Sequence, residues 1–493
     1  MGNNSGHRKA AASLDRRGFM RQTGLGAGAI ALGSVVGAPE AHSKPGETQR
    51  KAKSRGVDYD VIVLGGGFAG ITAARESSKN GYRTLVLEAR DRLGGRTYTS
   101  QFAGHMVELG GTWIHWTQPF VWAEVQRYKL DVIETPESNV DPAGVHAVVL
   151  VDGRREYLDT PERLGDVFGA FNRYFADAGK LWERPYDAKY RWPAIAAADR
   201  LSASDVVQSM KLSRLQQVAL DGYLAGLSHC PPGMASHIEV SRWWALPGGN
   251  LTALRDAAGR YRFKDGTISL INAMVADGKP EIRLSTPVRA VEDLGSHAVV
   301  TTQAGQRLRA ASVIVGLPMN VLPGVQFSPP LDASVVAAGQ ERHAGRGVKL
   351  LIKVKGRVAD TRVLALADPT HPLPLIITYA AADDHTVLVM FGPDPKRIDY
   401  QDKAAVQQAL RDFFPDAQVE EVHFHPWTED PYSLGTWANY RPGWFEKYYA
   451  HFQQDRGRVI FGQGDHGEGW RGFIDGAIGA GIRAAERAKI MLG

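Results

Sequence analysis

Three glycines with the spacing Gly65-x-Gly67-x-x-Gly70 follow an apolar run, Val61 to Leu64, and precede a stretch with helical periodicity. This order is typical of a loop that binds a dinucleotide pyrophosphate. The first glycine permits a tight turn, the second lets backbone approach the phosphates, and the third lets the helix pack on the strand. The first amides of the helix then face the anion. The spacing therefore predicts a nucleotide cofactor.

The residues after this motif narrow the choice of nucleotide. Glu88 ends a second apolar run, where a carboxylate can accept hydrogen bonds from a ribose diol. A carboxylate disfavours a 2′-phosphate, which leaves FAD or NAD. Arg90 and the run Gly94-Gly95-Arg96 favour FAD, because a second glycine pair flanked by cations offers the longer cofactor another backbone approach and charge partners. The alternative is an ordinary glycine-rich turn between a strand and a helix.

Composition indicates a large globular protein. The chain has 493 residues, 44% of them hydrophobic, which suggests two or three domains. Its formal net charge of +5 falls to +1 without residues 1–38, and no basic stripe with interleaved aromatics appears elsewhere, so we expect no nucleic-acid partner. Cys230 is the only cysteine, which excludes an intrachain disulfide and a cysteine-based zinc site. We expect no bound metal.

The N-terminus predicts a location. Arg16 and Arg17 precede a Gly/Ala-rich apolar run from Thr23 to Ala38, a pattern similar to a twin-arginine export signal. We therefore expect a periplasmic protein with a signal over residues 1–38 and a polar linker over 39–56. A leader that stays attached and holds the protein at the membrane, or a disordered basic tail, are the alternatives. This export route carries folded proteins, which suits an enzyme that acquires its cofactor in the cytoplasm.

The remaining patterns predict an α/β chain, α+β overall, with a Rossmann-like domain that is interrupted. A glycine-containing strand end at 107–116 precedes a helical stretch through Tyr128. Residues 134–263 have a helical and irregular pattern, which we interpret as structural packing. Alternating strands then occupy 281–317, a β-rich segment covers 348–389, and a helix lies near 403–413. A strand enters a loop at 458–465, and a helix spans 475–492.

Taken together, the motifs resemble the flavin-containing amine oxidases related to monoamine oxidase. The resemblance covers residues 57–493, and within the family it is nearest to the bacterial enzymes of nicotine breakdown. It is carried by these segments: Gly65–Gly70, Glu88–Arg90, Gly94–Arg96, Gly110–Trp113, Thr286–Val288, Asp430–Trp437 and Phe473–Asp475, with the nicotine-branch likeness in 67–76 and 115–124. The family fold implies FAD-binding parts at 57–133, 264–338 and 430–493, and substrate-domain parts at 134–263 and 339–429.

The resemblance also implies site residues. The cofactor-binding residues that it implies are Gly65, Gly67, Phe68, Ala69, Gly70, Glu88, Ala89, Arg90, Gly95, Arg96, Gly111, Thr112, Val288, Asp465 and Ile474. It assigns the catalytic pocket to Trp437 and Phe473 as two aromatic walls, to Trp113 beside the flavin, and to Lys349 near flavin N5. For Lys349, the alternative is an edge-strand lysine that extends to solvent. His115 is expected behind the pocket.

Three positions depart from the family pattern. Thr436 stands where monoamine oxidases carry the cysteine that is linked to the flavin, so we expect FAD to be bound non-covalently. Phe473 replaces the tyrosine that is common at that wall. Asp465 stands where the family usually has a glutamate, which changes the expected contacts to the ribityl chain.

The implied reaction moves the equivalent of a hydride from the α-carbon of a neutral amine to flavin N5, and water then hydrolyses the iminium. The nicotine branch implies pseudooxynicotine as the substrate, with nicotine as the second candidate. The electron acceptor is O2 or a c-type cytochrome, and a homodimer is left open. A related desaturase, an L-amino-acid oxidase that uses Arg242 or Arg262, and a flavin-carrying electron-transfer subunit without its own turnover are the alternative functions.

Overall fold

Two large β-sheets organise the protein in a computed structural model that describes residues 56–136, 145–359, 362–452 and 454–493. The expected export signal, and the expected linker except for its last residue, lie outside these ranges. Within them, no helix is both long enough and apolar enough to cross a lipid bilayer.

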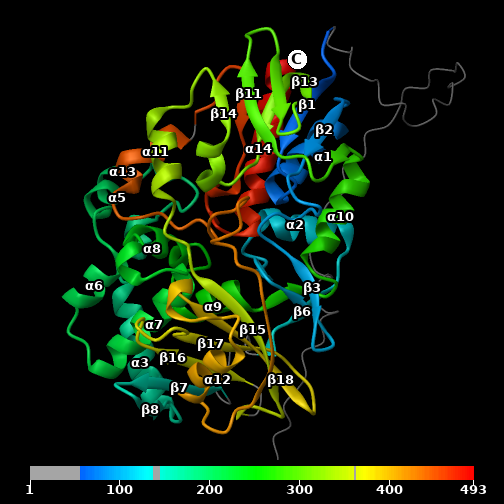
Figure 1. Ribbon diagram of the computed structural model, residues 1–493. Helices are drawn as coiled ribbons and strands as arrows, with labels where there is room; N and C mark the ends of the chain where they lie inside the picture. Colours follow the sequence, from blue (N-terminus) through cyan, green and yellow to red (C-terminus); the bar gives the residue numbers. More distant parts are fainter. Residues whose placement is uncertain (1–55, 137–144, 360–361, 453) are drawn as a thin grey trace, which may run out of the picture. The chain divides into compact units, whose positions relative to one another are not determined.

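The first sheet has β1 near its centre. Strand β1 pairs in parallel with β2 on one side and with β13 on the other, and β20 adds in parallel to β13. The eight strands are β10 (Glu281–Arg283), β2 (Thr84–Leu87), β1 (Tyr59–Leu64), β13 (Arg307–Val315), β12 (Ala298–Thr302), β11 (Val288–Asp293), β14 (Gln326–Ser328) and β20 (Val459–Phe461). The sheet thus collects strands from three separated stretches of the chain (Figure 1).

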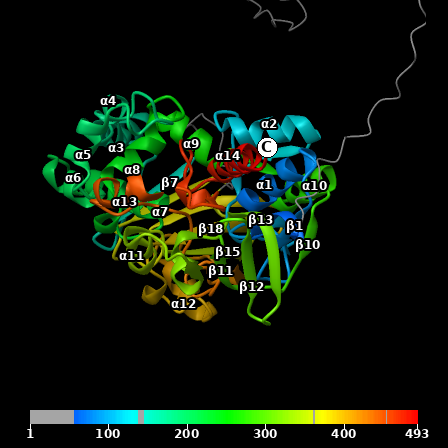
Figure 2. The ribbon, with the colours of Figure 1, turned by 90° about the horizontal axis from the view of Figure 1, so that it is seen from above.

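Helices cover this sheet because its parallel strands are apolar on both faces. Residues Val61 to Leu64 are fully buried, as expected for a strand covered on both sides. Helices α1 (Phe68–Lys79), α10 (Thr267–Gly278) and α14 (Ile474–Leu492) lie together beside β1 and β13 (Figure 2). Gly481 of α14 lets that helix approach α1 closely, since a Cβ there would lie 2.3 Å from the carbonyl oxygen of Ala69.

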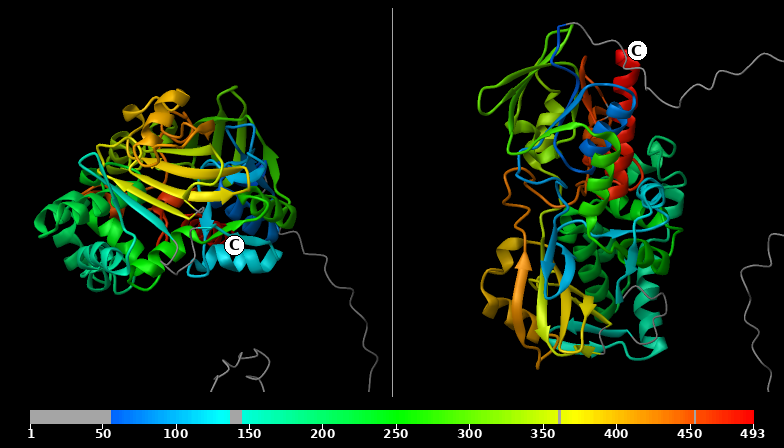
Figure 3. Two further views of the ribbon diagram at one scale, coloured as in Figure 1. Left: turned by 90° about the horizontal axis from the view of Figure 1, so that it is seen from below. Right: turned by 90° about the vertical axis from the view of Figure 1, so that its right-hand side faces the viewer.

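The second sheet has seven strands in the order β19 (Val419–Phe424), β15 (Val348–Lys355), β18 (His385–Gly392), β17 (Leu375–Ala381), β16 (Val363–Ala367), β7 (His146–Val151) and β8 (Arg154–Tyr157). Its strands alternate between two cores, as a period of two requires. Leu351 and Leu364 pack with helices between 161 and 259, whereas Leu350 and Val363 pack with α12 (Lys403–Arg411). The two sets of helices lie on opposite faces of this sheet (Figure 3).

The helices on the first of these faces come from one long stretch of chain. They are α3 (Pro161–Tyr174), α4 (Ala178–Leu181), α6 (Ala203–Ser209), α7 (Arg214–Ser228), α8 (His237–Ala245) and α9 (Leu251–Gly259). Helix α5 (Trp192–Ala198), from the same stretch, packs instead in the core that includes Ile62 and Val313 of the first sheet. The remaining elements are α2 (Pro119–Tyr128), α11 (Ala333–Glu341), α13 (Trp444–Phe452), the hairpin β3 (Thr99–Phe102) with β4 (His105–Glu108), and the small sheet of β5 (Trp113–Ile114), β9 (Tyr261–Phe263) and β6 (Val132–Glu134).

The expected fold class is confirmed by this architecture. The sheet of β1 receives strands only from residues before 103 and after 280, and the sheet of β15 takes its strands from 146–157 and 348–424. This alternation follows the order that we expected for an interrupted nucleotide-binding domain. The division of the chain into domains stays a prediction.

Candidate active site

One continuous cavity of about 640 Å³ runs between the first sheet and the helices of the second. It is lined by thirteen of the fifteen expected cofactor residues: Gly65, Gly67, Phe68, Ala69, Glu88, Ala89, Arg90, Gly95, Arg96, Gly111, Thr112, Val288 and Ile474. The four expected catalytic residues, Trp113, Lys349, Trp437 and Phe473, line it too. Gly70 and Asp465 do not line it.

Two glycines of the loop between β1 and α1 have different roles. A Cβ at Gly70 would lie 1.9 Å from the carbonyl oxygen of Gly65, so Gly70 is needed for α1 to pack against the strand end. A Cβ at Gly67 would meet only ordinary contacts, the nearest 3.6 Å away at Gly95, and Gly67 faces the cavity. Helix α1 begins without a side-chain cap, so its first amides are available to an anion.

Glu88 is held in place by backbone amides. Its Oε2 accepts from the amide of Gly66 at 2.6 Å, and its Oε1 accepts from the amide of Arg90 at 2.8 Å. The side chain is buried yet lines the cavity. Each carboxylate oxygen keeps a second lone pair, so Glu88 is pre-positioned to accept further hydrogen bonds.

Both expected phosphate-region arginines are already paired with carboxylates. Arg90 donates from Nη2 to Asp430 Oδ1 at 2.7 Å, and Arg96 pairs with Asp465 and donates to the carbonyl of Thr436 at 2.8 Å. Burial alone would raise the pKa of Asp465, but Arg96, His343 and the amide of Met319 together hold that pKa below its usual value. Asp465 therefore lies behind Arg96 and fixes it, instead of facing the cavity as the family pattern implied.

Lys349 points to the cavity side of its sheet and is fully bonded. Its strand β15 lies between β19 and β18, so the edge-strand alternative is wrong. The Nζ atom donates to the carbonyls of Glu108 and Gly110, at 2.8 and 2.9 Å, and to the hydroxyl oxygen of Thr112 at 2.6 Å. Burial lowers the pKa of Lys349 to about 7, although the Glu108 carboxylate opposes the shift.

Two aromatic side chains stand at the expected walls, and each packs against a second ring. Phe473 is the N-cap residue of α14 and packs edge-on against Trp470, with ring centroids 4.9 Å apart. Trp437 lies parallel to the imidazole of His229, with centroids 4.2 Å apart and planes at 6°. Trp113, near Phe391, donates from Nε1 to the hydroxyl of Thr135 at 3.0 Å. The cavity therefore has rigid aromatic surfaces.

A buried ion-pair network holds the segment before Phe473. Arg471 donates to both carboxylate oxygens of Glu239, at 3.0 and 2.6 Å, and Arg242 donates to the same carboxylate at 2.6 Å. Burial would raise the pKa of Glu239, but the two guanidinium groups hold it below its usual value. Arg242 is thus engaged with Glu239. It does not line the cavity, and neither does Arg262, which donates to the carbonyl of Met106.

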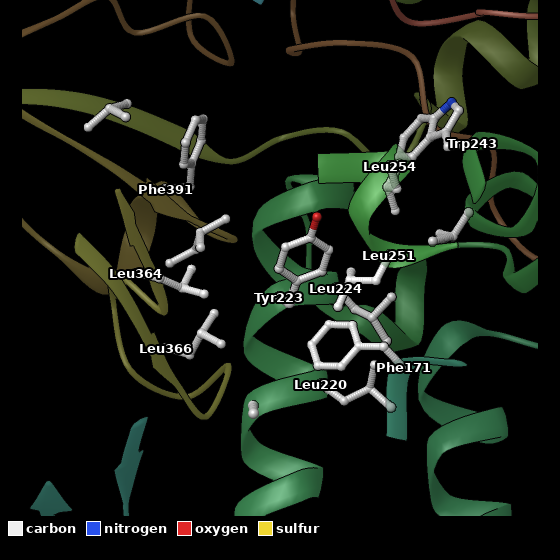
Figure 4. Close-up of a cluster of buried hydrophobic side chains, with 14 of the residues drawn as sticks. Phe171, Leu220, Tyr223, Leu224, Trp243, Leu251, Leu254, Leu364, Leu366 and Phe391 are labelled. Carbon is white, nitrogen blue, oxygen red and sulfur yellow. The ribbon is translucent and has the colours of Figure 1, made fainter. Parts of the chain in front are cut away.

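The substrate half of the cavity includes residues that the sequence pattern did not reveal. They are Phe168, Tyr223, Leu227, His229, Leu364, Leu375, Ile377 and Phe391. Figure 4 shows side chains of the second sheet, including Leu364 and Phe391, facing those of α7, including Tyr223. Apolar periodicity marked these segments as packing, and only the fold shows which packed residues border a cavity. His115, expected behind the pocket, bonds Asp256 at 2.8 Å and does not line it, although Asp256 does.

Known proteins with similar sequences use a flavin to oxidise amines. The sequence profile described as "Flavin containing amine oxidoreductase" matches residues 68–489. This chain belongs to that family. A relative named pseudooxynicotine dehydrogenase, from a Pseudomonas species, is 38% identical over 95% of this chain and 94% of its own length. Nicotine dehydrogenase from Pseudomonas putida is 37% identical over 96% of this chain and 98% of its own length.

A solved structure shares the fold of this flavin containing amine oxidoreductase. Wild-type putrescine oxidase bound to putrescine superposes with a TM-score of 0.75 at 21% identity, covering 88% of this chain and 99% of the other. Family membership makes this chain an enzyme, an oxidoreductase that acts on amines with a flavin cofactor. The predicted family and enzyme class are confirmed.

The residues present fit FAD as that flavin. The bare Cα of Gly67 and the uncapped start of α1 suit a pyrophosphate, and Glu88 is positioned for a ribose. Farther along, the buried hydroxyl of Thr436 lines the cavity without a hydrogen-bond partner among the described residues. When bound, the flavin supplies a two-electron acceptor for the carbon–nitrogen bond, and the protein supplies position and surroundings.

Proposed function

We propose that this enzyme oxidises a small secondary or tertiary amine joined to a pyridyl-type group, with pseudooxynicotine as the first candidate and nicotine as the second. The amine would lose a hydride equivalent from its α-carbon to the flavin. For pseudooxynicotine, water would then hydrolyse the iminium to an aldehyde and methylamine. The relatives named for these two compounds match nearly the whole chain, which supports this substrate class.

The observation that carries the proposal is that Trp437 and Phe473 line the same cavity, as two aromatic walls. Such walls hold a neutral amine by shape and keep water out, which favours transfer from a fixed α-carbon. Lys349 cannot approach a substrate freely, since its three hydrogen bonds anchor it to the segment 108–112. With all three donors occupied, it is suited to fixing the 108–112 segment beside the flavin, not to donating to a water.

The two competing functions, amino-acid oxidase and electron-transfer subunit, can be distinguished from amine oxidation. An amino-acid oxidase needs a cation for the substrate carboxylate. The arginines that we considered for that role, Arg242 and Arg262, do not line the cavity, whereas Arg255 does, so amino acids belong in the substrate panel. An electron-transfer subunit would not be reduced by an amine. The test is anaerobic mixing with a panel of amines, followed by the flavin absorbance. Bleaching by secondary methylamines supports the proposal, and an unbleached flavin with every amine would reject it.

We also propose that FAD is held without a covalent bond, that the enzyme is periplasmic, and that O2 or a c-type cytochrome reoxidises it. Thr436 supports the first point, because a hydroxyl cannot form the thioether of monoamine oxidases. The second rests on Arg16 and Arg17, which lie outside the described residues. Replacing both with lysine should leave the enzyme in the cytoplasm, and stopped-flow reoxidation with each acceptor would separate the oxidants.

A further inference from the structure

His229 is an unusual polar group in the cavity wall. Among the described residues that line the cavity, only His229 and Thr436 have buried side-chain nitrogen or oxygen atoms without a hydrogen-bond partner. Neither ring nitrogen of His229 has a hydrogen-bond partner of good geometry among the described residues. The backbone of Val348 is close enough to act on the pKa of His229, in the upward direction. Leaving a buried polar atom without a partner is costly, so such atoms usually meet a ligand or a water.

The backbone around His229 is arranged to hold this ring at the cavity. His229 caps α7 in the left-handed conformation, with φ 54°, which is uncommon for residues other than glycine. Three successive carbonyls at this helix end accept hydrogen bonds: Leu227 from the Trp437 indole, Ser228 from Asn439, and His229 from the amides of Arg346 and Gly347. The helix end is thereby tied to the segments that carry Trp437 and Lys349.

The ring itself occupies a seat shaped for it. A Cβ at Gly347 would lie 2.3 Å from the His229 ring, so glycine is needed there. The imidazole covers one face of the Trp437 indole and meets Phe391 edge-on, with centroids 5.8 Å apart. Burial lowers the pKa of His229 to about 4, and nearby Lys349 acts in the same direction. At neutral pH the ring is therefore uncharged and has one N–H donor and one bare nitrogen.

We infer that His229 is a substrate-binding residue, which stacks on the aromatic wall Trp437 and forms a hydrogen bond with a polar atom of the amine substrate. The inference rests on the proposed function. A neutral imidazole beside the wall can accept from an amine N–H or donate to a carbonyl or pyridyl nitrogen, all of which the proposed substrate class contains. His229 then contributes to selecting the substrate, in addition to supporting the wall.

The test compares variants that separate the ring from its nitrogens. His229→Phe keeps a ring that can stack on Trp437 and loses both polar atoms, whereas His229→Asn and His229→Gln keep polar atoms near the two nitrogen positions and lose the ring. In anaerobic flavin reduction, we expect His229→Phe to raise the substrate dissociation constant roughly 10-fold while changing the limiting rate much less. At least one amide variant should recover part of the binding.

His343→Phe is the matched control. His343 is equally buried, its ring nitrogens also have no partner among the described residues, and it does not line the cavity. Its replacement should leave the substrate dissociation constant unchanged. Calorimetric titration of each holoenzyme with 1-(pyridin-3-yl)butan-1-one, which has no amine to oxidise, gives a second measure of binding that does not depend on turnover.

Substrate analogues identify the bonded atom. Replacing pyridyl by phenyl, or methylamino by dimethylamino, should make wild type and His229→Phe bind alike if that group is the partner. If wild type still binds both analogues more tightly than His229→Phe does, the substrate carbonyl is the hydrogen-bond partner of His229. A dissociation constant for His229→Phe within 2-fold of wild type, or an equal loss in His343→Phe, would overturn the role of His229. If no amine reduces the wild-type flavin, the proposed function fails instead.

Discussion

Arg90 donates from Nη2 to Oδ1 of Asp430 at 2.7 Å, and this pair joins the segment after β2 to the segment that carries Trp437. Both side chains are nearly buried. Asp430 also accepts from the amide of Tyr432 and bonds the imidazole of His425, each at 2.8 Å. One carboxylate therefore fixes both a cation beside the nucleotide loop and the approach to the aromatic wall.

We predict that Asp430→Asn lowers the free energy of unfolding by about 3 kcal/mol, because the nearly buried Arg90 guanidinium loses its nearest counter-charge and keeps only Glu88, 3.9 Å away. Urea unfolding of the apoprotein measures this change. Asp177→Asn is the control, since Asp177 and Lys180 form an exposed ion pair whose loss should cost under about 1 kcal/mol. Equal losses of unfolding free energy in the two variants would show that the Arg90–Asp430 pair stabilises the fold no more than an exposed ion pair does.

The two kinds of glycine in the nucleotide loop give opposite predictions. Gly67→Val should leave a folded apoprotein, because its Cβ meets only ordinary contacts and the side chain would occupy the space of the pyrophosphate. Gly70→Ala should instead lower stability by about 1–3 kcal/mol, because its Cβ strikes the carbonyl of Gly65. Flavin absorbance per protein and circular dichroism distinguish these outcomes. Normal flavin content in Gly67→Val would contradict the assigned cradle.

Trp437→Ala should slow anaerobic flavin reduction roughly 100-fold and leave FAD content nearly unchanged, because the wall orients the amine and does not hold the nucleotide. In the wild type, the reduction rate should rise with pH as the substrate amine loses its proton. Stopped-flow absorbance measures both effects. A rate that depends on neither pH nor Trp437 would count against an amine cage.

Lys349 should make stability depend on pH. Its pKa is lowered by burial from an ordinary 10.5 to about 7, so between these values the unfolded chain binds a proton that the folded chain does not. Stability contributed by this group therefore increases as the pH rises from about 7 to 10, by up to roughly 1.4 kcal/mol per pH unit. Lys349→Met should remove that increase in urea unfolding measured across this range. Lys355→Met, an exposed lysine on the same strand, should preserve it.

Acid precipitation tests how the flavin is attached. Because Thr436 has no thiol, all of the yellow colour should appear in the supernatant after the protein is precipitated. Absorbance of pellet and supernatant is the measurement. Colour retained in the pellet would mean that another side chain forms a covalent bond to the cofactor.

Local patterns in the sequence were sufficient for the elements that hold the nucleotide. The spacing of Gly65, Gly67 and Gly70 depends on backbone geometry within one loop, and the alternation in β15 places Lys349 on the same face as Leu351. These features follow from periods of two residues or from single turns, and they can be predicted without knowing the rest of the fold.

Contacts between distant segments could not be predicted in this way. Nothing in the residues around 229 indicates that His229 stacks on Trp437, 208 positions later. Likewise, Arg90 looked like a free cation for phosphate until its partner Asp430 was placed beside it. Asp465 followed a strand, as a cofactor-binding residue can, but the turn after β20 buries it behind Arg96. Such pairings depend on tertiary packing, which overrides what single segments suggest.

The parallel arrangement of β1, β13 and β20 has a consequence for biogenesis. The ribosome makes β1 early and β20 near the end of the chain, and at about 5–20 residues per second the two are separated by roughly 20–80 s of synthesis. Until then the nascent chain lacks both β20 and α14, and α14 is the helix that packs on α1. The site for the flavin is therefore completed only after residues 459–492 have been synthesised, so chains that stop before them should not bind flavin.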